Sequence, residues 1–396
     1  MTAPLHVAVV TETYPPEVNG VAMTLGRMVQ GLLARGHRVS LTRPRQHAAD
    51  VPPATPGMST TLVRGLPIPG YAGLKFGLPA PRLLRRQWRA DRPDVVQVVT
   101  EGPLGGSAVA AARALGIPVV SEFHTNFHTY SRHYGFAWLE DLVAAHLRRL
   151  HNRSHMTLVP SRQLGIDLQR SGYHHTRVVA RGIDTALFNP ARRSAALRAD
   201  WNMGEKDLVV AHVGRLAPEK NLPLVLSTFA AIRRHAPGAR LLLVGDGPAR
   251  ARLMQEHPDH IHAGMRHGED LAAHYASADL FLFPSMTDTW GNVTLEALAS
   301  GLPVVAYRMA AAAQLIRHGD NGMLADPGAS DQFVRGALDL VTRPQARRRM
   351  AMAAPSSVAA LDWESIHEQL VAALRAAIAR PAPPPAGQSI FSVLPD

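Results

Sequence analysis

Short runs of apolar residues alternate along the chain with longer stretches in which apolar residues recur at helical spacing. The runs in the first half lie at 6–10, 37–42, 94–99 and 117–123. After a break the series resumes, at 207–214, 239–245, 260–264, 278–285 and 302–307. Continuous apolar runs separated by helical stretches are typical of parallel strands that are buried on both faces and joined by helices. The pattern therefore predicts an α/β protein with two doubly wound domains.

The break between the two series sets the expected domain boundaries. We expect an N-terminal domain at 1–184, a linker at 185–205 and a C-terminal domain at 206–354. A last helical stretch at 355–380 is expected to cross back to the N-terminal domain. Prolines crowd the residues after it, and since proline can neither continue a helix nor join a central strand, 381–396 is expected to be a loose tail.

Length and composition agree with a two-domain globular protein. A chain of 396 residues exceeds the usual size of one domain, and 46% of its residues are hydrophobic and 18% charged. The sequence has no cysteine, which excludes disulfides, iron–sulfur clusters, thiolate zinc sites and a cysteine nucleophile. Because it has neither a signal-peptide pattern nor a long uncharged apolar segment, we expect a cytoplasmic location.

The charge is concentrated in the first half of the chain. Residues 1–190 hold 21 Lys and Arg against 11 Asp and Glu, whereas the remaining residues are almost balanced, at 21 against 20. This imbalance indicates an anionic partner. No zinc-finger, RNP-type or basic-zipper pattern is present and aromatic residues are only 6%, so we do not expect nucleic acid to be that partner.

Residues 80–93 are the candidate contact with a membrane, because they predict a short basic amphipathic helix. Its expected docking residues are Arg82, Arg85, Arg86, Trp88 and Arg89. Such a helix suits an anionic membrane surface. The alternative is an ordinary surface helix whose apolar face packs on its own sheet.

Ligands of open α/β sheets bind at the carboxyl ends of the strands, so the loops after the apolar runs are the candidate sites. Gly20 follows the first run and opens a helix, whose first backbone N–H groups could receive an anion. No G-x-G-x-x-G motif follows that run, which argues against a dinucleotide enzyme. His124 follows the fourth run and could hydrogen-bond a substrate hydroxyl. The alternatives are a glycine that only turns the chain and a histidine of the surface or core.

In the second half, Arg215 and Lys220 follow an apolar run and are five residues apart. A guanidinium and an ammonium that converge on one place could neutralise the two charges of a diphosphate, above all while the diphosphate departs as a leaving group. Gly245, after the next run, provides a turn with room for a base or a ribose. A solvated surface pair is the alternative interpretation of Arg215 and Lys220.

The most informative string is TDTWGNVTLEALASGLPVVA at 287–306. Asp288 precedes a predicted helix and Glu296 lies inside it, so Asp288 could bind sugar hydroxyls and Glu296 a ribose diol. Phosphate could be held by the exposed amides of Asn292, Val293, Thr294 and Leu295. A helix cap and a solvated acid are the alternatives for the two carboxylates.

Together with PPEVNGVA, FHTNFH, RGIDTALF, GRLAPEKN and VGDGP, this string makes the chain similar to the retaining glycosyltransferases of family 4, group 1. The resemblance spans roughly 5–380. It implies the GT-B fold, two Rossmann-like domains facing across a cleft. Family members usually carry two glutamates with seven residues between them, and here the first is Asp288. That departure also occurs in a subgroup resembling GDP-mannose-dependent mannosyltransferases and sulfoquinovosyl transferases.

The resemblance also implies a role for each candidate residue. A nucleotide-diphospho-sugar is held by the C-terminal domain, where Arg215 and Lys220 neutralise the leaving diphosphate. Glu296 binds the ribose and Asp288 the sugar. The acceptor is held by the N-terminal domain, where His124 lies by the sugar and Gly20 lets the first loop approach the phosphates.

We therefore expect a metal-independent hexosyltransferase, since the sequence contains no Asp-x-Asp pair and basic side chains can replace a metal's electrostatic role. The favoured reaction moves mannose from GDP-mannose to a glycolipid or lipid-linked glycan, at the inner face of the plasma membrane. One alternative is a UDP-sugar-dependent glucosyl or sulfoquinovosyl transferase. Others are a sugar-nucleotide epimerase, a phosphorylase, or a non-catalytic partner that binds the nucleotide-sugar.

Overall fold

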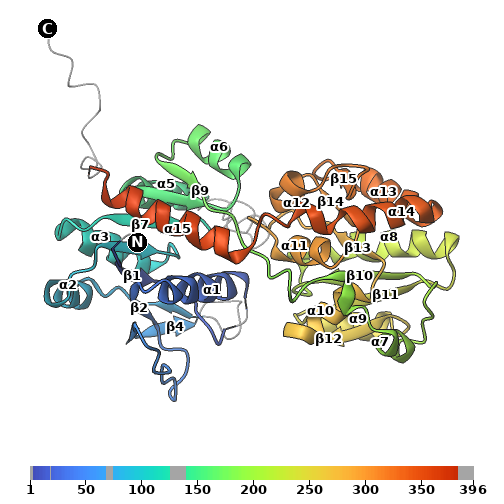
Figure 1. Ribbon diagram of the computed structural model, residues 1–396, viewed down its shortest axis with the longest axis horizontal. Coiled ribbons are helices and arrows are strands. Elements are labelled where there is room, and N and C mark those ends of the chain that lie inside the picture. The colour runs from blue at the N-terminus through green and yellow to red at the C-terminus, as the bar shows by residue number, and fades with distance from the viewer. Residues whose placement is uncertain (1–2, 18, 68–74, 125–139, 382–396) are drawn as a thin grey trace, which may run out of the picture. The chain divides into compact units, whose positions relative to one another are not determined.

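The computed structural model describes residues 3–17, 19–67, 75–124 and 140–381. The chain divides into two compact units, of which the first comprises Met1–Ala180 and Trp363–Asp396 and the second Arg181–Asp362 (Figure 1). Apart from Pro381, the expected tail lies outside the described residues.

The first unit is built on a parallel sheet of seven strands in the order β3-β2-β1-β6-β7-β8-β9. These strands are β1 (His6–Val10), β2 (Arg38–Pro44), β3 (Met58–Val63), β6 (Val95–Val98), β7 (Val119–Glu122), β8 (Met156–Val159) and β9 (Thr176–Val178). A separate antiparallel pair consists of β4 (Gly65–Pro67) and β5 (Lys75–Gly77). The helices of the unit are α1 (Gly20–Ala34), α2 (Pro81–Ala90), α3 (Pro103–Ala114), α5 (Glu140–Asn152), α6 (Arg162–Arg170) and α15 (Trp363–Ile378).

Helix α2 lies with its apolar face in the core of the first unit. Leu84 is fully buried and Trp88 is only 4% exposed, and both belong to the cluster formed by β1, β6 and α3. Trp88 is therefore not available to a membrane, which corrects its assignment as a docking residue. The indole packs between the helix and the sheet because exposing it would leave a large apolar area in contact with water.

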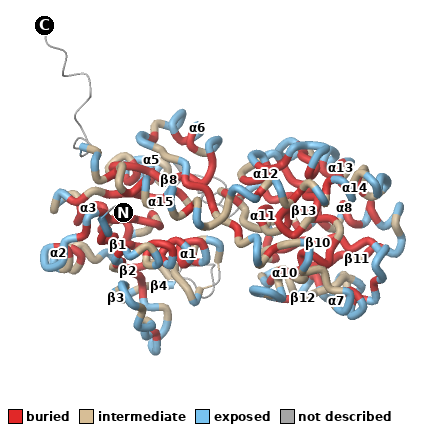
Figure 2. Tube along the Cα trace, viewed as in Figure 1, coloured by how far each residue is buried: buried red, intermediate tan, exposed pale blue. Residues whose placement is uncertain are grey.

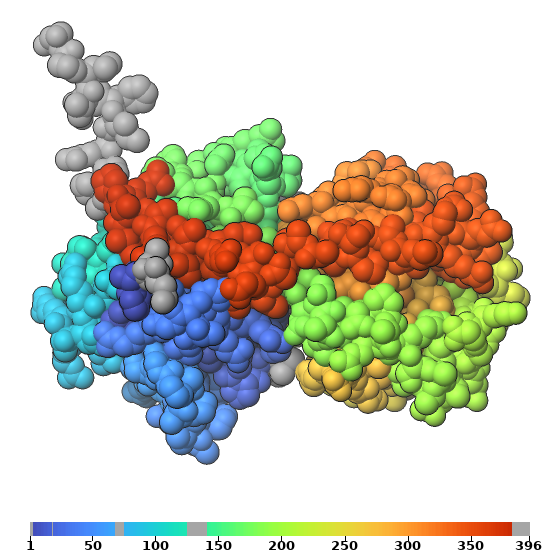
Figure 3. Space-filling model, viewed as in Figure 1, coloured from blue at the N-terminus to red at the C-terminus, as the bar shows by residue number. Residues whose placement is uncertain are grey.

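The chain returns to the first unit through α15, which packs on α1 (Figures 1 and 3). The two helices lie close together at Gly31, where a Cβ atom would stand 2.2 Å from the ring of His367. His367 donates a hydrogen bond from Nε2 to the carbonyl oxygen of Arg27, at 3.0 Å. A glycine in α1 thus allows the last helix to lie directly on it.

The second unit has a parallel sheet of six strands in the order β12-β11-β10-β13-β14-β15. These are β10 (Val209–Val213), β11 (Arg240–Val244), β12 (Ile261–Gly264), β13 (Leu280–Phe283), β14 (Val304–Tyr307) and β15 (Gly322–Ala325). Its helices are α7 (Ala195–Asp200), α8 (Leu222–His235), α9 (Arg250–Glu256), α10 (Gly268–Ala276), α11 (Asn292–Ala299), α12 (Ala310–Leu315), α13 (Ser330–Thr342) and α14 (Pro344–Ala353). The short 3₁₀ helices are η2 (Pro190–Arg192), η3 (Pro218–Lys220) and η4 (Pro355–Ser357). Two parallel sheets with buried central strands confirm the predicted fold class (Figure 2).

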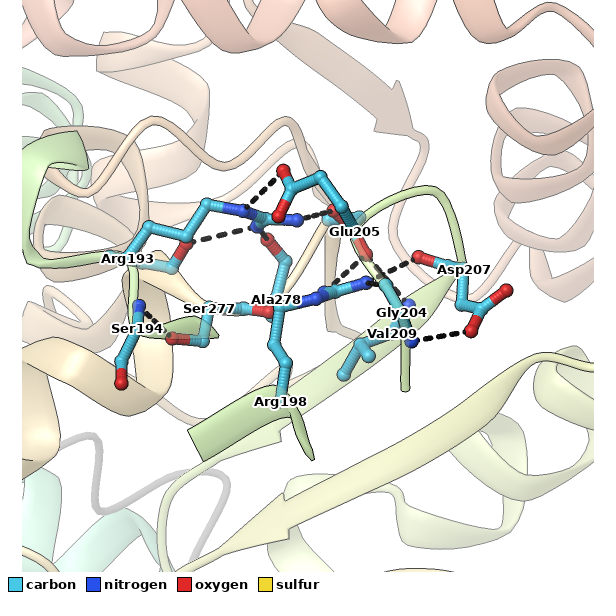
Figure 4. Close-up of polar contacts among 11 residues, drawn as sticks. Arg193, Ser194, Arg198, Gly204, Glu205, Asp207, Val209, Ser277 and Ala278 are labelled. Atoms are coloured by element: carbon cyan, nitrogen blue, oxygen red, sulfur yellow. Dashed lines mark hydrogen bonds and ion pairs between the residues drawn. The ribbon is translucent and has the colours of Figure 1, made fainter. Parts of the chain in front are cut away.

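The segment predicted as a linker, 185–205, is an integral part of the second unit. Arg198 is 1% exposed and donates to the carbonyl oxygens of Ser277, Gly204 and Asp207 at 2.6–2.7 Å (Figure 4). Its guanidinium also pairs with Asp279 at 3.1 Å. A buried charge is stable only when it is paired and hydrogen-bonded in this way. One arginine thus fixes α7 to the start of the second sheet.

Each sheet reverses its strand order once, between β1 and β6 in the first unit and between β10 and β13 in the second. At such a point the loops that leave the carboxyl ends of neighbouring strands diverge, and ligands of open α/β sheets bind there. The loops after β10 and β13 contain GRLAPEKN and the TDTWGN string.

Candidate functional site

An ion pair joins the two loops at the switch point of the second unit. Lys220 ends η3, after β10, and Asp288 lies in the loop after β13; the Lys220 Nζ is 2.8 Å from each carboxylate oxygen of Asp288. The Lys220 side chain is 15% exposed and that of Asp288 is 23% exposed, so the pair remains open to a ligand. Asp288 does not cap α11, because the N-cap residue is Gly291 and no side chain accepts a hydrogen bond there.

Two further side chains hold the pair in place. Ser285 donates its hydroxyl to Asp288, and the Lys220 ammonium lies 5.7 Å from the centroid of the Phe283 ring. Phe283 is the last residue of β13, and Ser285 lies two residues later. The spacing of the sequence gave no signal that either side chain would contact the pair. The arrangement offers an anion a positive charge and offers sugar hydroxyls a carboxylate that accepts hydrogen bonds.

His212, on β10, is a buried neighbour that sequence analysis did not identify. It is fully buried, and burial lowers the pKa of its imidazole to about 4. The ring is therefore neutral, with Nδ1–H donating to the carbonyl oxygen of Leu282 at 2.9 Å. A neutral ring next to Lys220 and Asp288 adds no charge of its own to the site.

Glu296, inside α11, is held by a tyrosine. The Tyr275 hydroxyl donates to Oε2 of Glu296 at 2.8 Å, from a fully buried position on α10. Burial raises the pKa of Glu296 to about 7, and the hydrogen bond from Tyr275 acts in the opposite direction. The carboxyl therefore titrates near neutrality.

The start of α11 only partly matches the predicted phosphate cradle. Gly291 is the N-cap residue, with φ +86°, and no side chain caps the helix. Asn292 and Val293 are partly exposed at the first positions. Thr294 and Leu295 are buried, and the Thr294 amide donates to the Gly291 carbonyl oxygen at 3.0 Å. The cradle is thus limited to the beginning of the helix.

Arg215 and Gly245 have neighbours that the sequence did not suggest. Arg215 lies 3.8 Å from the carboxylate of Glu219, and its side chain is 38% exposed. A Cβ atom on Gly245 would stand 2.0 Å from the carbonyl oxygen of Gly214. The absence of a side chain at Gly245 thus lets two loops of the protein approach each other, rather than leaving open room for a base.

In the first unit, His124 belongs to a buried polar chain. Its Nε2 lies 2.8 Å from Oε2 of Glu122, the last residue of β7, whose Oε1 accepts a hydrogen bond from Gln97 at 2.5 Å. The side chains of Glu122 and His124 are 1% and 6% exposed. The carboxylate fixes the orientation of the imidazole, since ring N–H groups donate to it. Glu122 stands two residues before His124, at the end of a predicted strand.

Gly20 opens α1 as predicted, but the helix terminus is already capped. The side-chain oxygen of Asn19 accepts hydrogen bonds from the amides of Val21 and Ala22, at 3.1 and 2.9 Å. The expectation that these N–H groups are open to an anion is therefore corrected for Val21 and Ala22.

Within the described residues, no group of three or more His, Asp or Glu side chains could hold a metal ion. In the same part of the chain, no helix has the length and apolar character needed to span a bilayer. On α2, Arg82, Arg86 and Arg89 are exposed, while Arg85 is half-buried and donates to the Pro81 carbonyl oxygen at 3.3 Å.

Comparison with known proteins matches two long segments of the chain to glycosyltransferase families. Residues 207–343 match the family described as glycosyl transferases group 1, and residues 18–187 match Glycosyltransferase Family 4. Among solved structures, a sucrose-phosphate synthase from Thermosynechococcus elongatus has a TM-score of 0.78 at 20% identity, over 95% of this chain and 99% of that one. That likeness supports the GT-B fold.

Curated relatives are nearer in sequence. A GDP-mannose-dependent alpha-mannosyltransferase of Corynebacterium glutamicum is 31% identical over 370 residues, which are 93% of this chain and 88% of the relative. A sulfoquinovosyl transferase of Arabidopsis thaliana is 33% identical over 313 residues, 76% of this chain and 60% of the relative. The chain therefore belongs to the family 4 glycosyltransferases and is a retaining hexosyltransferase that uses a nucleotide-sugar donor.

Proposed function

We propose that this enzyme transfers mannose from GDP-mannose to a hydroxyl group of a glycolipid or lipid-linked glycan. The observation that carries the donor site is the pairing of Lys220 with Asp288 at the switch point of the second sheet. The choice of mannose and GDP is supported by the name of the Corynebacterium relative, a GDP-mannose-dependent alpha-mannosyltransferase.

In this proposal Lys220, with Arg215, neutralises the donor diphosphate as it leaves. Asp288 accepts hydrogen bonds from the mannose hydroxyls, and Glu296 accepts them from the ribose diol. The anomeric C–O bond to the diphosphate breaks while a bond from the acceptor oxygen forms, and the acceptor proton passes to the leaving diphosphate. Positive charge next to the diphosphate lowers the barrier because it stabilises charge that develops in the transition state.

His124 of the first unit is the residue proposed to contact the reacting sugar. Its pairing with the buried Glu122 gives the imidazole one fixed orientation. A side chain that is already oriented loses less entropy when the substrate binds than a mobile side chain does. Gly20 is proposed to let the loop after β1 approach the donor.

A lipid acceptor is supported by α2. Arg82, Arg86 and Arg89 are exposed on a helix whose apolar side chains, Leu84 and Trp88, are already buried in the protein. The proposed contact is therefore an electrostatic attraction between the arginines and anionic lipid, without insertion of apolar side chains into the bilayer. We propose that it places the enzyme peripherally on an anionic membrane. Each arginine near such a surface contributes about 1 kcal/mol.

Calorimetry of the full chain without added metal tests the donor assignment. GDP and UDP are compared first, followed by GDP-mannose and UDP-sugars. Tighter binding of GDP and GDP-mannose is expected, and transfer is then followed with mannolipid and polyprenyl acceptors. Preference for UDP and its sugars would contradict the GDP-mannose assignment, and binding of no nucleotide would contradict the donor site itself.

Sulfoquinovosyl transfer is the second candidate, because the Arabidopsis relative carries that name at 33% identity. The same titrations separate the two, since this candidate requires a UDP-sugar. It is supported if a UDP-sugar binds and GDP-mannose does not.

A further inference from the structure

Tyr275 makes a contact with the donor site that the proposed function does not use. Its ring is fully buried and its hydroxyl reaches Oε2 of Glu296 at 2.8 Å. Tyr275 lies near the end of α10 and Glu296 in the second turn of α11, two helices that pack on each other. The hydroxyl thus meets the carboxylate from the protein interior.

The tyrosine ring is itself enclosed by aromatic side chains. Phe188 packs edge-on against it, with ring centroids 5.9 Å apart and an interplanar angle of 79°. Phe281, on β13, lies 5.7 Å away. Phe188 ends the RGIDTALF string, and a turn in which its amide donates to the Asp184 carbonyl oxygen at 2.8 Å holds it there. Phe188, which has no role in the donor site described so far, thus forms one wall around the tyrosine ring.

We propose that Tyr275 is a positioning residue for donor binding: its hydroxyl occupies Oε2 of Glu296 and leaves Oε1 to accept hydrogen bonds from the ribose diol. The inference rests on the proposed role of Glu296. Because Phe188 and Phe281 contact the tyrosine ring on two sides, its hydroxyl holds Oε2 of the carboxylate in one place. Binding then requires less ordering of the glutamate side chain.

The same contact sets the pH range in which the donor binds. Burial raises the pKa of Glu296 to about 7, and the Tyr275 hydrogen bond stabilises the ionised form. An ionised carboxylate accepts hydrogen bonds on both oxygens, so affinity rises as the pH increases through about 7. Burial and the neighbouring carboxylate raise the pKa of Tyr275 well above its usual value, so its hydroxyl keeps its proton.

Other titratable groups on the elements that contact α11 have different partners. Glu269 pairs with Arg192 at 3.1 Å and Asp270 with Arg266 at 3.0 Å. His274 donates from Nδ1 to the Asp270 carbonyl oxygen at 2.7 Å, and Tyr307 lies 3.5 Å from Ser330. Among the described residues, Tyr275 is thus the titratable neighbour that acts on Glu296.

The test is the pH dependence of nucleotide-sugar binding to the full-length Tyr275→Phe variant, measured by calorimetry between pH 6 and 9. GDP-mannose is the probe, because its doubly esterified diphosphate does not titrate in this range. At pH 7 we expect a loss of affinity of about tenfold. We also expect the midpoint of the pH profile to move about one unit to the alkaline side, since the ionised carboxylate loses its donor.

Four further variants make the result specific. Tyr307→Phe removes a buried hydroxyl from the same unit and should bind as the parent does. Glu296→Gln should flatten the profile, and adding Tyr275→Phe to it should cause no further loss. Replacing the residue at 275 with 3-fluorotyrosine keeps the ring and makes the hydroxyl a stronger donor, so the midpoint should move to the acid side even if the phenylalanine variant does not fold.

An unchanged midpoint in both position-275 variants, or an additive loss in the double variant, would overturn the positioning role while leaving the proposed function intact. Absence of nucleotide-sugar binding by the parent protein would overturn both.

Discussion

The ammonium of Lys220 stands 2.8 Å from each of the two carboxylate oxygens of Asp288, which lies 68 positions later in the sequence. They meet because β10 and β13 are neighbours in the sheet, so the loops that follow these strands leave the same edge. In the structure the two groups satisfy each other. In the proposed function, a bound diphosphate would share the lysine and sugar hydroxyls would share the aspartate.

Replacing Lys220 with Ala should reduce kcat/KM by about a factor of 10² to 10³, because the charge that stabilises the leaving diphosphate is lost. The melting temperature should stay within a few degrees of the parent value, since the pair is partly exposed. Lys206→Ala is the matched control, because Lys206 is an exposed lysine of the same unit. Unchanged turnover in Lys220→Ala would remove this residue from the donor site.

Membrane binding should depend on the exposed arginines of α2. Replacing Arg82, Arg86 and Arg89 with Ser should weaken binding to vesicles of anionic lipid at low salt by about 100-fold, at about 1 kcal/mol per arginine. The control changes Arg343, Arg348 and Arg349, exposed arginines of the second unit, to Ser, and removes the same charge. Vesicle flotation at two salt concentrations measures both. Equal losses in the two variants would indicate an effect of net charge alone.

Ala310 begins α12 with φ +48°, in the left-handed region. A side chain costs about 1–2 kcal/mol in this conformation, against about 0.5–1 kcal/mol for the extra flexibility of glycine in the unfolded chain. Ala310→Gly should therefore stabilise the second unit by about 0.5 kcal/mol or more. Ala313→Gly, at an exposed position inside the same helix, should destabilise it. Thermal melting measures both variants. A lower melting temperature for Ala310→Gly than for the parent would contradict backbone strain at Ala310.

The stability of the first unit should depend on pH through the ionisation of Glu12. This residue follows β1 and is 8% exposed. Burial raises its pKa to about 7, although amides of Gly77 and Leu104 donate to its carboxylate. The folded chain therefore binds a proton between pH 4.5 and 7 that the unfolded chain releases, and the contribution of Glu12 to stability falls as the pH rises through this window.

The parent should lose about 2 kcal/mol more than Glu12→Gln between pH 5 and 7.5. The comparison must be a difference between the two proteins, because buried histidines such as His6 and His155 have lowered pKa values and act in the opposite sense. Glu368→Gln, an exposed substitution in the same unit, is the control. Parallel stability curves for the parent and Glu12→Gln would contradict the assignment.

The candidate donor site could be predicted only in part from the sequence. Lys220, Asp288 and Glu296 were identified because each follows a strand or lies in the helix that comes next. Tyr275 and Glu122 were not, because a side chain that acts through another residue carries no motif of its own. The capping of α1 by Asn19 was also missed: a helix start looks the same in the sequence whether its amides are capped or open.

Apolar runs and helical spacing determined the fold class, because strands buried on both faces and the helices between them impose local periodicities. The tertiary structure decided which faces and segments these elements bury. Trp88 could face a membrane or a core on the evidence of spacing alone, and packing against β6 and α3 placed it in the core. Similarly, 185–205 falls in the break between the two series of apolar runs, but Arg198 finds its carbonyl partners only when strands β10 and β13 are assembled. Partners far apart in sequence are brought together by burial of the whole sheet, and no local pattern encodes them.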